Sequence, residues 1–452
     1  MKTQTALGIV VLTLCAIVTA TPPNAQAGPA NRRASTEPPP NYPINLDGFG
    51  APLPAVASSI PDLSTFATGQ LNFKEIEELP QLGPLFNGTT CTGCHSQPAT
   101  GGGGLFINEI RVRNNTDPGP VHIFAVDNML RNGAQLQGGT PIFASGVHAE
   151  PLGCQITVPG CQLSACQQEE AMKTTFNTDL PTCDPTSTNF ASGGDCVAGR
   201  AALALLGDGL VEAVSDEALI QLAQNEPQSV RGTVKMVTEN FLHTAHVGRF
   251  GWKDDHAFLR AFSGDAYLNE MGITNPDNPT DTSDCAIGVS QYGITLEDTG
   301  IEDQTGPDGR ADIDRFTDFM RALAPPPTIP QNWSATRGKA LFSEVGCSGC
   351  HAPSLTTASN PASFIPASTG GTRMSSTVNQ ALAQQTFHPY GDFLLHNMGA
   401  LGDGITSGAA GPTIMRTAPL WGLRAKSIFL HDGRAADLPT AISLHDGQGR
   451  AA

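Results

Sequence analysis

The sequence predicts a mainly α-helical fold in which two similar modules are accompanied by a loop-rich insertion stapled by disulfides. One pentapeptide pattern, C-x-x-C-H, occurs twice, at 91–95 and at 347–351. Between the copies, apolar residues recur at helical spacing. Five cysteines crowd into the stretch from Cys154 to Cys196, among Pro, Thr, Ser and Gly. The repeat indicates two modules, the periodicity indicates helices, and the cysteines indicate the insertion.

The repeated pentapeptide is the attachment pattern of c-type haem. Each thiol adds across a porphyrin vinyl group, and the adjacent histidine becomes the proximal iron ligand. A thioredoxin-like redox pair and half of a zinc site are the alternatives, but two copies with His in the same place favour haem. We therefore predict two covalently attached haems c. The attachment and proximal residues are Cys91, Cys94 and His95 in the first copy, and Cys347, Cys350 and His351 in the second.

The N-terminus has the features of an export signal. Lys2 precedes an apolar stretch, Ala6 to Ala20, that is too short to span a membrane, and Ala25 to Ala27 offers an A-x-A cleavage site. We expect a signal peptide at 1–27, a flexible Pro-rich leader at 28–45 and no membrane span. Export to an oxidising compartment, where haem is attached to thiols, indicates the periplasm.

The net charge of −17 bears on the partners of the chain. A protein that binds nucleic acid or anionic lipid would carry the opposite sign, so we expect neither. An acidic surface would instead steer a positively patched electron-donor protein, such as a small cytochrome or a cupredoxin. Simple solubility is the alternative explanation of the charge.

The eleven cysteines divide into three groups. Cys15 leaves with the signal peptide and four cysteines carry haem, so an even number remains. In an exported protein these should pair as three disulfides, with the connectivity open; a catalytic dithiol is the alternative. The six are Cys154, Cys161, Cys166, Cys183, Cys196 and Cys285.

Three helices and one domain boundary can be placed. Ser215 should cap a helix, and a second helix should run from about Ala311 to Leu323. The run Pro325 to Pro327 ends that helix and separates an N-terminal haem domain, 46–324 with its insertion near 150–200, from a C-terminal cytochrome c-like haem domain, 331–452. Beyond the boundary, Ser334 can cap a helix through Val345 that leads into the second pentapeptide.

An acidic segment lies between the insertion and the second module. Asp303 to Asp314 contains Gly306 and Gly309, but its spacing does not fit an EF-hand loop. Calcium is a further cofactor that this segment could bind.

Five segments resemble the bacterial dihaem oxidoreductase family, which is also described as a peroxidase or thiol oxidoreductase-like family. The resemblance covers most of the mature chain, apart from the Cys-rich insertion. Family members usually continue into a final helix after the position of His445, and the sequence departs from the family there. The matching segments are Leu82–Asn87, Gly248–Lys253, Glu270–Thr274, Tyr390–Gly399 and Arg416–Arg434.

The family is similar, more remotely, to dihaem cytochrome c peroxidases, which implies two cytochrome c-like helical domains. In those peroxidases a Met ligand stands fourteen positions after a motif His, which matches His431, so the resemblance implies His445 as sixth ligand of the second haem. Met398 is the other choice. The Glu-Met pair that supplies the distal acid–base group matches Glu270-Met271, although Arg260 and Gly264 replace the Gln and Pro of the peroxidases.

Other residues have roles that the resemblance leaves open. Trp252 could be an aromatic relay between the haems or plain core, and Arg434 could contact a haem propionate. An additional histidine could close the first haem and abolish peroxidase activity. The unassigned histidines are His122, His148, His243, His246 and His256.

The sequence thus predicts a periplasmic dihaem c-type cytochrome that acts as a peroxidase-like oxidoreductase. A haem that cleaves peroxide needs an open sixth position and a nearby acid–base group, for which we name Glu270. The substrate would be peroxide or another small molecule, with electrons passed between the haems. A non-catalytic dihaem electron carrier is the alternative, and oxidation of a protein or small-molecule substrate is a third reading.

Overall fold

The computed structural model describes residues 46–77, 85–86, 88–105, 107–113, 125–126, 129–130, 133–134, 142–143, 183–185, 196–280, 301–371 and 373–451. The helices are α1 Pro54–Ala57, α2 Ile60–Lys74, α5 Asp208–Glu212, α6 Asp216–Asn225, α7 Leu259–Met271, α9 Asp312–Ala322, α10 Trp333–Glu344, α11 Ser376–Leu382, α12 Leu438–Ser443 and α13 Gln448–Ala451. Short 3₁₀ helices are η1 Cys91–Gly93, η2 Cys347–Gly349, η3 Pro361–Ser363, η4 Gly399–Leu401 and η5 Leu423–Ala425. The predicted signal peptide and leader lie outside these residues.

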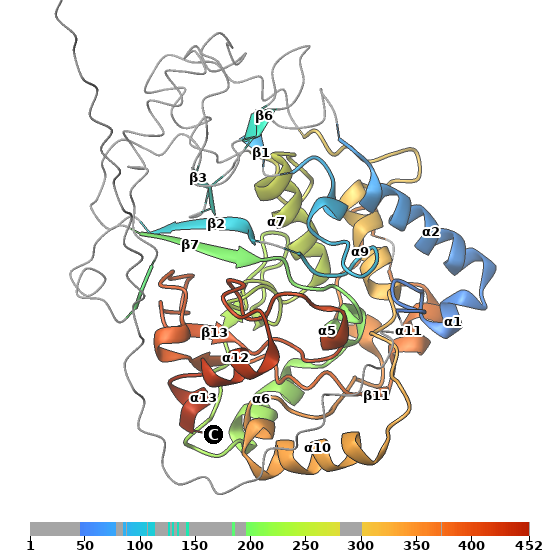
Figure 1. Ribbon diagram of the computed structural model, residues 1–452. Helices are drawn as coiled ribbons and strands as arrows, with labels where there is room; N and C mark the ends of the chain where they lie inside the picture. The colour runs from blue at the N-terminus through green and yellow to red at the C-terminus, as the bar shows by residue number, and fades with distance from the viewer. Residues whose placement is uncertain are drawn as a thin grey trace, which may run out of the picture. The chain divides into compact units, whose positions relative to one another are not determined.

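The strands are short apart from β2 Ile107–Arg113 and β7 Cys196–Ala201, which pair antiparallel (Figure 1). They form a four-stranded sheet in the order β3-β4-β2-β7, a three-stranded sheet in the order β1-β5-β6, and three two-stranded pairs, β8–β9, β10–β11 and β12–β13. Because helices are the longest elements, the prediction of a mainly α fold is confirmed. The remaining strands are β1 Leu85–Phe86, β3 Ala125–Val126, β4 Met129–Leu130, β5 Gly133–Ala134, β6 Ile142–Phe143, β8 Met236–Val237, β9 His246–Val247, β10 Leu355–Thr356, β11 Thr386–Phe387, β12 Leu395–Asn397 and β13 Ile414–Arg416.

Helix α2 packs against α9, and α7 lies on the other side of α9 (Figure 1). Gly69 of α2 lies so close to α9 that a Cβ there would overlap the main-chain oxygen of Arg315. Asn72 donates to Asp312 across the same interface, at 3.1 Å. The missing side chain therefore sets how closely the two helices approach.

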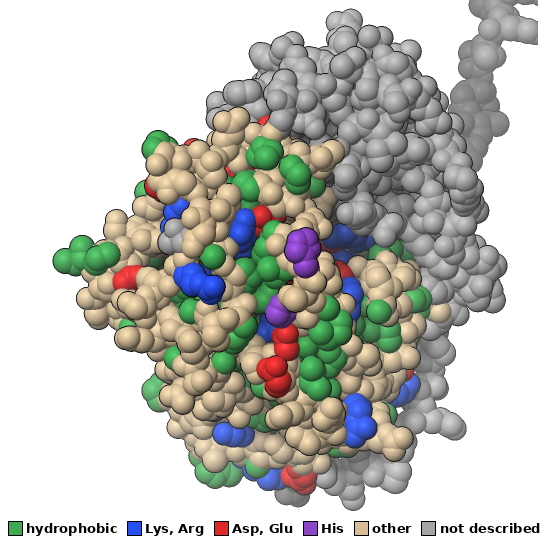
Figure 2. Space-filling model, turned by 180° about the vertical axis from the view of Figure 1, so that it is seen from behind, with side chains coloured by type: hydrophobic (Ala, Val, Ile, Leu, Met, Phe, Trp, Pro, Cys, Tyr) green, Lys and Arg blue, Asp and Glu red, His purple; other side chains and the backbone are tan. Residues whose placement is uncertain are grey.

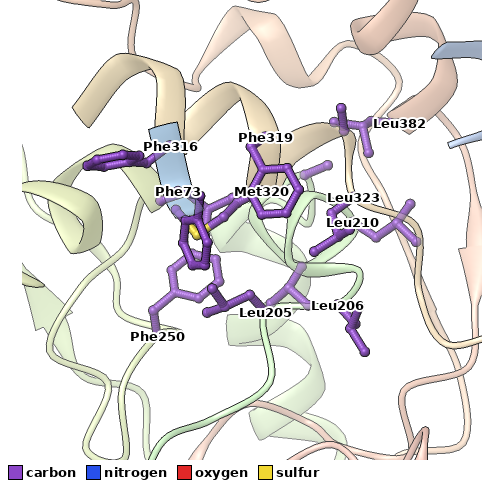
Figure 3. Close-up of a cluster of buried hydrophobic side chains, with 14 of the residues drawn as sticks. Phe73, Leu205, Leu206, Leu210, Phe250, Phe316, Phe319, Met320, Leu323 and Leu382 are labelled. Atoms are coloured by element: carbon purple, nitrogen blue, oxygen red, sulfur yellow. The ribbon is translucent and has the colours of Figure 1, made fainter. Parts of the chain in front are cut away.

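The main hydrophobic core is built from both sides of the Pro run (Figure 3). Phe319 of α9 is fully buried and lies 5.2 Å from Phe66 and 5.1 Å from Phe73, measured between ring centroids. Leu382 and Phe393 belong to the same cluster although they follow residue 331. The described residues between 46 and 451 form one compact unit by their contacts. The two domains with their boundary at the Pro run stay a prediction.

The predicted helices are present, with one correction. Ser215 caps α6 by accepting a hydrogen bond from the Ala218 N–H, and α9 ends at Ala322, just before the Pro run. The helix before the second pentapeptide exists as α10, but Ser334 does not cap it. Asn332 does, because its side chain accepts from the Ala335 N–H at 2.9 Å.

The acidic segment at 303–314 supplies caps for α9. Asp303 accepts hydrogen bonds from the N–H groups of Asp312 and Ile313, at 2.7 and 3.2 Å. Asp314 accepts from the N–H groups of Ala311 and Thr369. Carboxylates are favoured at helix N-termini, so these contacts account for both residues without a cation. Calcium in this segment stays a prediction.

One of the predicted disulfides lies in the described part of the chain. Cys183 and Cys196 are joined, with their Cα atoms 4.9 Å apart. The other four cysteines predicted to pair, Cys154, Cys161, Cys166 and Cys285, lie outside the described residues.

Among the described residues, no helix combines the length and apolar character needed to cross a membrane. On the face of the molecule in Figure 2, Lys and Arg side chains are dispersed among neutral and acidic ones.

The α2–α9 contact predicts opposite effects of one substitution at two helical glycines. Gly69→Ala should lower the free energy of unfolding by about 1–3 kcal/mol, because overpacking outweighs a gain in helix propensity of about 1 kcal/mol. Gly338→Ala in α10 should raise it by about 0.5–1 kcal/mol, because nothing lies within 4 Å of the added methyl group. Urea-induced unfolding of the full chain measures both. Stabilisation by Gly69→Ala would show that the interface has room.

Candidate functional sites

The two C-x-x-C-H segments adopt the same local structure. Each pair of cysteines spans a 3₁₀ turn, η1 or η2. In each, the histidine N–H donates to the carbonyl of the first cysteine at 3.0 Å, from His95 to Cys91 and from His351 to Cys347. The turn therefore brings both thiols and the following imidazole of each site to one side of a compact loop.

The first site depends on the glycines that follow His95. The Gly101 N–H donates to the main-chain oxygen of His95 at 2.9 Å, and the oxygen of Gly102 lies 3.3 Å from His95 Nδ1. A Cβ at Gly101 would lie 2.5 Å from Leu323 Cδ2, and one at Gly102 would overlap the oxygen of Gln97. Only glycine permits this return of the chain. It leaves His95 Nε2 as the nitrogen that can bind a metal.

A partly open cavity of about 160 Å³ adjoins this loop. Cys91, Cys94 and His95 line it, and so do Glu270 from α7 and Trp252. Phe73 packs edge-on against His95, with 6.2 Å between ring centroids. The structure therefore brings Glu270 into the same cavity as the first pentapeptide.

Basic and acidic side chains gather at the wall of this cavity that β2 and β7 form. Arg200 is 3 % exposed and donates to Asp403, with 2.8 Å between Nε and Oδ2, and it lies 3.4 Å from Glu109. Arg111 pairs with Glu109 as well. Guanidinium groups are the usual partners of carboxylates, and at this wall both arginines are already paired with carboxylates of the chain itself.

His256 also lines the cavity, but both of its ring nitrogens are engaged. Nδ1 lies 3.2 Å from Glu239 Oε2, and Nε2 lies 3.4 Å from Asp265 Oδ2. Burial opposes the charged form, but Asp265 and Glu239 outweigh it and raise the pKa of His256 to about 10. A protonated imidazole has no lone pair for iron. His246 contacts Asp216, and His122 and His148 lie outside the described residues.

The first thiol does not have the properties of a redox-active cysteine. Burial, followed by the charge of Glu77, raises the pKa of Cys91 to about 12. Reactive dithiols need a depressed pKa, because the thiolate is the nucleophile. The thioredoxin-like alternative therefore finds no support here.

At the second site, α10 leads into η2 and a later segment orients the histidine. The oxygen of Tyr390 lies 3.0 Å from His351 Nδ1, which again leaves Nε2 as the nitrogen that can bind a metal. Burial lowers the pKa of His351, so the imidazole is neutral, as a ligand must be. Phe342 of α10 packs edge-on against the ring, with 6.4 Å between centroids.

His445 lies opposite His351. Their ring centroids are 6.4 Å apart and the rings are inclined at 58°. His445 Nδ1 lies 2.8 Å from the oxygen of Ala441, so this ring also keeps Nε2 available. Metal–nitrogen bonds of about 2.0–2.1 Å put the centroids of two imidazoles on one ion roughly 6 Å apart. Met398 lies nearby, since a Cβ at Gly449 would be 3.1 Å from its Cε and 3.0 Å from His445 Cδ2.

Trp252 and His431 lie next to each other beside the first site. Their ring centroids are 6.0 Å apart, and Trp252 Nε1 donates to the oxygen of Ala201 at 2.9 Å. Burial lowers the pKa of His431 to about 4, so it is neutral. Arg434 pairs with Asp432 and is partly exposed.

Sequence reasoning missed a buried cluster next to the second site. Glu226, Asp392 and His396 each place a carboxylate oxygen or ring nitrogen within 4.8 Å of the others. The Nδ1 atom of His396 lies 3.6 Å from Cys350 Sγ. His396 lies in the matching segment Tyr390–Gly399, but the partner at 226 is too distant in sequence for any local pattern to reveal.

The residues present fit two haems. Each pentapeptide offers two thiols, and a histidine whose Nδ1 is hydrogen-bonded to a main-chain oxygen. This is the arrangement that orients a metal-binding imidazole. The first site adds a cavity lined by Glu270 and Trp252, and the second adds a facing imidazole.

Comparison with known proteins agrees with this geometry. Residues 181–452 match the family model described as "Di-haem oxidoreductase, putative peroxidase", and this match covers more than half of the chain. No curated protein and no solved structure shows significant similarity to the chain. The family description names two haems, the number of pentapeptides in the sequence. The chain therefore belongs to the di-haem oxidoreductase family.

Proposed function

We propose that the chain is a periplasmic dihaem c-type cytochrome that reduces peroxide, or oxidises a partner with it, and that electrons pass between its two haems. The observation that carries the proposal is the contrast between the sites. Glu270 shares a cavity with His95, whereas His351 faces a second imidazole, His445. The His95 site has the arrangement of a catalytic site, and the His351 site has that of an electron-transfer centre.

Seven residues would hold the haems, in two cytochrome c-like domains at 46–324 and 331–452. When bound, the haems supply an iron with an open coordination position at the first site and reversible one-electron transfer at the second. Thioether bonds and iron ligands would come from Cys91, Cys94 and His95 at the first site and from Cys347, Cys350, His351 and His445 at the second.

The two haems would differ in their number of histidine ligands, because the two sites differ in how many imidazoles keep a free lone pair. At the first site the lining histidines are His95 and His256, and the latter is protonated by its two carboxylate partners. At the second site, His351 and His445 both direct Nδ1 to main-chain oxygens and keep Nε2. Two strong axial ligands suit electron transfer, and one suits binding of peroxide.

Glu270 would move the proton during cleavage of peroxide. Its carboxylate accepts the proton from the inner peroxide oxygen and returns it to the outer oxygen, so that water leaves. Glu270 is half-buried in the lining of the cavity, where a carboxyl group can hold a proton in passing.

An electron-donor protein with a basic patch is the proposed partner, because a net charge of −17 attracts such a surface over several ångströms. A small cytochrome or a cupredoxin would satisfy this requirement. The export signal of the sequence supports a periplasmic location for both proteins.

Covalent attachment at both pentapeptides predicts two haems per chain that acid–acetone does not extract. Pyridine haemochrome quantitation on the exported protein should give a ratio of two, because each site offers both thiols. The double variant Cys347→Ala, Cys350→Ala should give a ratio of one. Extractable haem, or a ratio of one in the wild type, would contradict the proposal.

Removing His445 should leave the sixth coordination position of the second haem iron vacant without breaking the covalent attachment of the haem. In His445→Ala, one low-spin ferric signal should become high-spin in electron paramagnetic resonance, while the haem ratio stays at two. The matched control is His388→Ala, an exposed histidine that contacts Pro353 near the same site. Conversion of the signal by Met398→Leu instead would assign the ligand to Met398.

Glu270→Gln should leave both haem spectra nearly unchanged and slow peroxide turnover by roughly two to four orders of magnitude, the usual contribution of a positioned acid–base group. Stopped-flow mixing with hydrogen peroxide measures the effect. The control Glu344→Gln removes a carboxylate that is 66 % exposed on α10 and should change nothing.

Intact turnover in Glu270→Gln would exclude the proton-transfer role. Two low-spin haems in the wild type, with no reaction with peroxide even after partial reduction, would identify an electron carrier instead.

A further inference from the structure

The cluster of Glu226, Asp392 and His396 has no part in the mechanism above, yet all three side chains are buried. They are 8 %, 0 % and 1 % exposed. Glu226 follows α6, Asp392 precedes β12, and His396 lies in β12. Ionisable groups cost free energy when buried, unless they are paired and hydrogen-bonded. Their position beside the second site therefore calls for a physical account.

The main chain holds each carboxylate in place. Glu226 Oε2 accepts from the Gly232 N–H at 2.7 Å, and Asp392 Oδ1 accepts from the Leu394 N–H at 2.9 Å. Asp392 Oδ2 lies 2.9 Å from His396 Nε2. A Cβ at Gly232 would lie 2.9 Å from that same nitrogen. The close approach of the two segments leaves both carboxylates facing one imidazole.

The charges of the cluster do not balance without an extra proton. Burial opposes a charged His396, but its hydrogen bond to Asp392 raises its pKa, and so does the Cys350 thiol, which becomes a neutral thioether when haem is attached. One positive imidazolium can neutralise one carboxylate. Burial, and then the charge of Asp392, raise the pKa of Glu226 to about 7. The Glu226 carboxyl group, which faces Asp392, therefore exchanges a proton near neutral pH.

Apart from His396, no basic side chain lowers the pKa of the Glu226 carboxyl group in the described part of the chain. The charged groups that face it are Asp392 and His396. Arg231 is close in sequence, but its guanidinium donates to the main-chain oxygen of Glu226 at 3.0 Å. The proton affinity of the pair therefore responds to any further charge placed nearby.

That further charge would be the haem iron of the second site. His396 Nδ1 lies 3.6 Å from Cys350 Sγ, and the oxygen of Tyr390, two residues before Asp392, receives the hydrogen bond of His351. One segment, 390–396, thus touches the covalent anchor and the proximal histidine and also carries two members of the cluster. Charges interact strongly across such a buried region.

We propose that the Glu226 carboxyl group, in its buried pair with Asp392, takes up one proton from solvent when the second haem gains one electron from its donor. The electron adds one negative charge and the proton one positive charge, so the buried region keeps its net charge. No other bond is made or broken. The inference rests on the proposed function only in requiring a redox-active haem at the second pentapeptide.

The sign of the effect follows from this coupling. Reduction adds negative charge and raises the proton affinity of the pair, so protonation in turn raises the reduction potential. The potential of the second haem should fall as pH rises through the range around the pKa of Glu226. Full coupling of one proton to one electron gives a fall of about 59 mV for each tenfold decrease in proton concentration.

Redox titration of the haem-loaded full chain, from about pH 5 to about pH 9, tests the proposal. The wild-type potential of the second haem should show this slope. Glu226→Gln should flatten it, because its amide oxygen still accepts from Gly232 but the carboxyl proton is gone. Glu217→Gln, on the exposed first turn of α6, is the control with the same change of charge and should retain the slope.

Three outcomes would overturn the inference. One is a flat wild-type titration, and another is a slope that Glu226→Gln does not change. The third is a stoichiometric divalent metal, found by elemental analysis of the purified protein and lost in Glu226→Gln, since a metal ion would take the place of the proton.

Two further results separate this inference from the proposed function. If the second pentapeptide carries no haem, the proposed function fails first. If Glu226→Gln does not load haem, the redox titration is repeated with Asp392→Asn. A second measurement on the wild type then tests the coupling: an indicator dye follows the protons released when the haem is oxidised. Release of one proton per electron near neutral pH supports the coupling, and no release refutes it.

Discussion

A hydrogen bond from imidazole Nδ1 to a main-chain oxygen is the interaction on which both sites depend. It fixes the tautomer of His95 and His351, and so decides that Nε2 is the nitrogen available to a metal. At the first site the acceptor exists because glycines let the chain turn back beneath the ring and against Leu323. At the second site it exists because the segment that contains Tyr390 returns to the pentapeptide. The position of each ligand is thus a property of main-chain geometry.

Local signals in the sequence could predict elements whose cause is local. Ser215 and the apolar spacing of α9 identified two helices, and the pentapeptides located both sites, because each pattern lies within a dozen residues. The cap of α10 was misplaced, since Asn332 and Ser334 are both good capping residues and only the backbone chooses between them. The cluster of Glu226 with Asp392 and His396, and the engagement of His256 by two carboxylates, arise from tertiary packing that no local pattern encodes.

The segment Gly248–Lys253, one of the five that resemble the dihaem oxidoreductase family, takes part in a network of buried charges. Lys253 is fully buried and donates to the oxygens of Gly411 and Ile414 at 3.0 and 2.7 Å, and its Nζ lies 2.9 Å from Asp403. Asp403 also accepts from Arg200 of β7, so the three side chains connect the wall of the first cavity to the C-terminal part of the chain. Breaking a buried pair by removing one partner typically costs 3–5 kcal/mol, which makes this network a rigid support for the adjacent Trp252.

The packing of α2 against α9 also governs the order in which the chain can mature. Asn72 and Asp312, which meet across that contact, are separated by 240 residues. A ribosome needs roughly 10–50 s to add that many residues. During this time Cys91 and Cys94 have left the ribosome, while the helix that completes the core around Phe73 does not yet exist. The first pair of thiols therefore emerges on an open chain, and the core around Phe73 can close only after α9 has been synthesised.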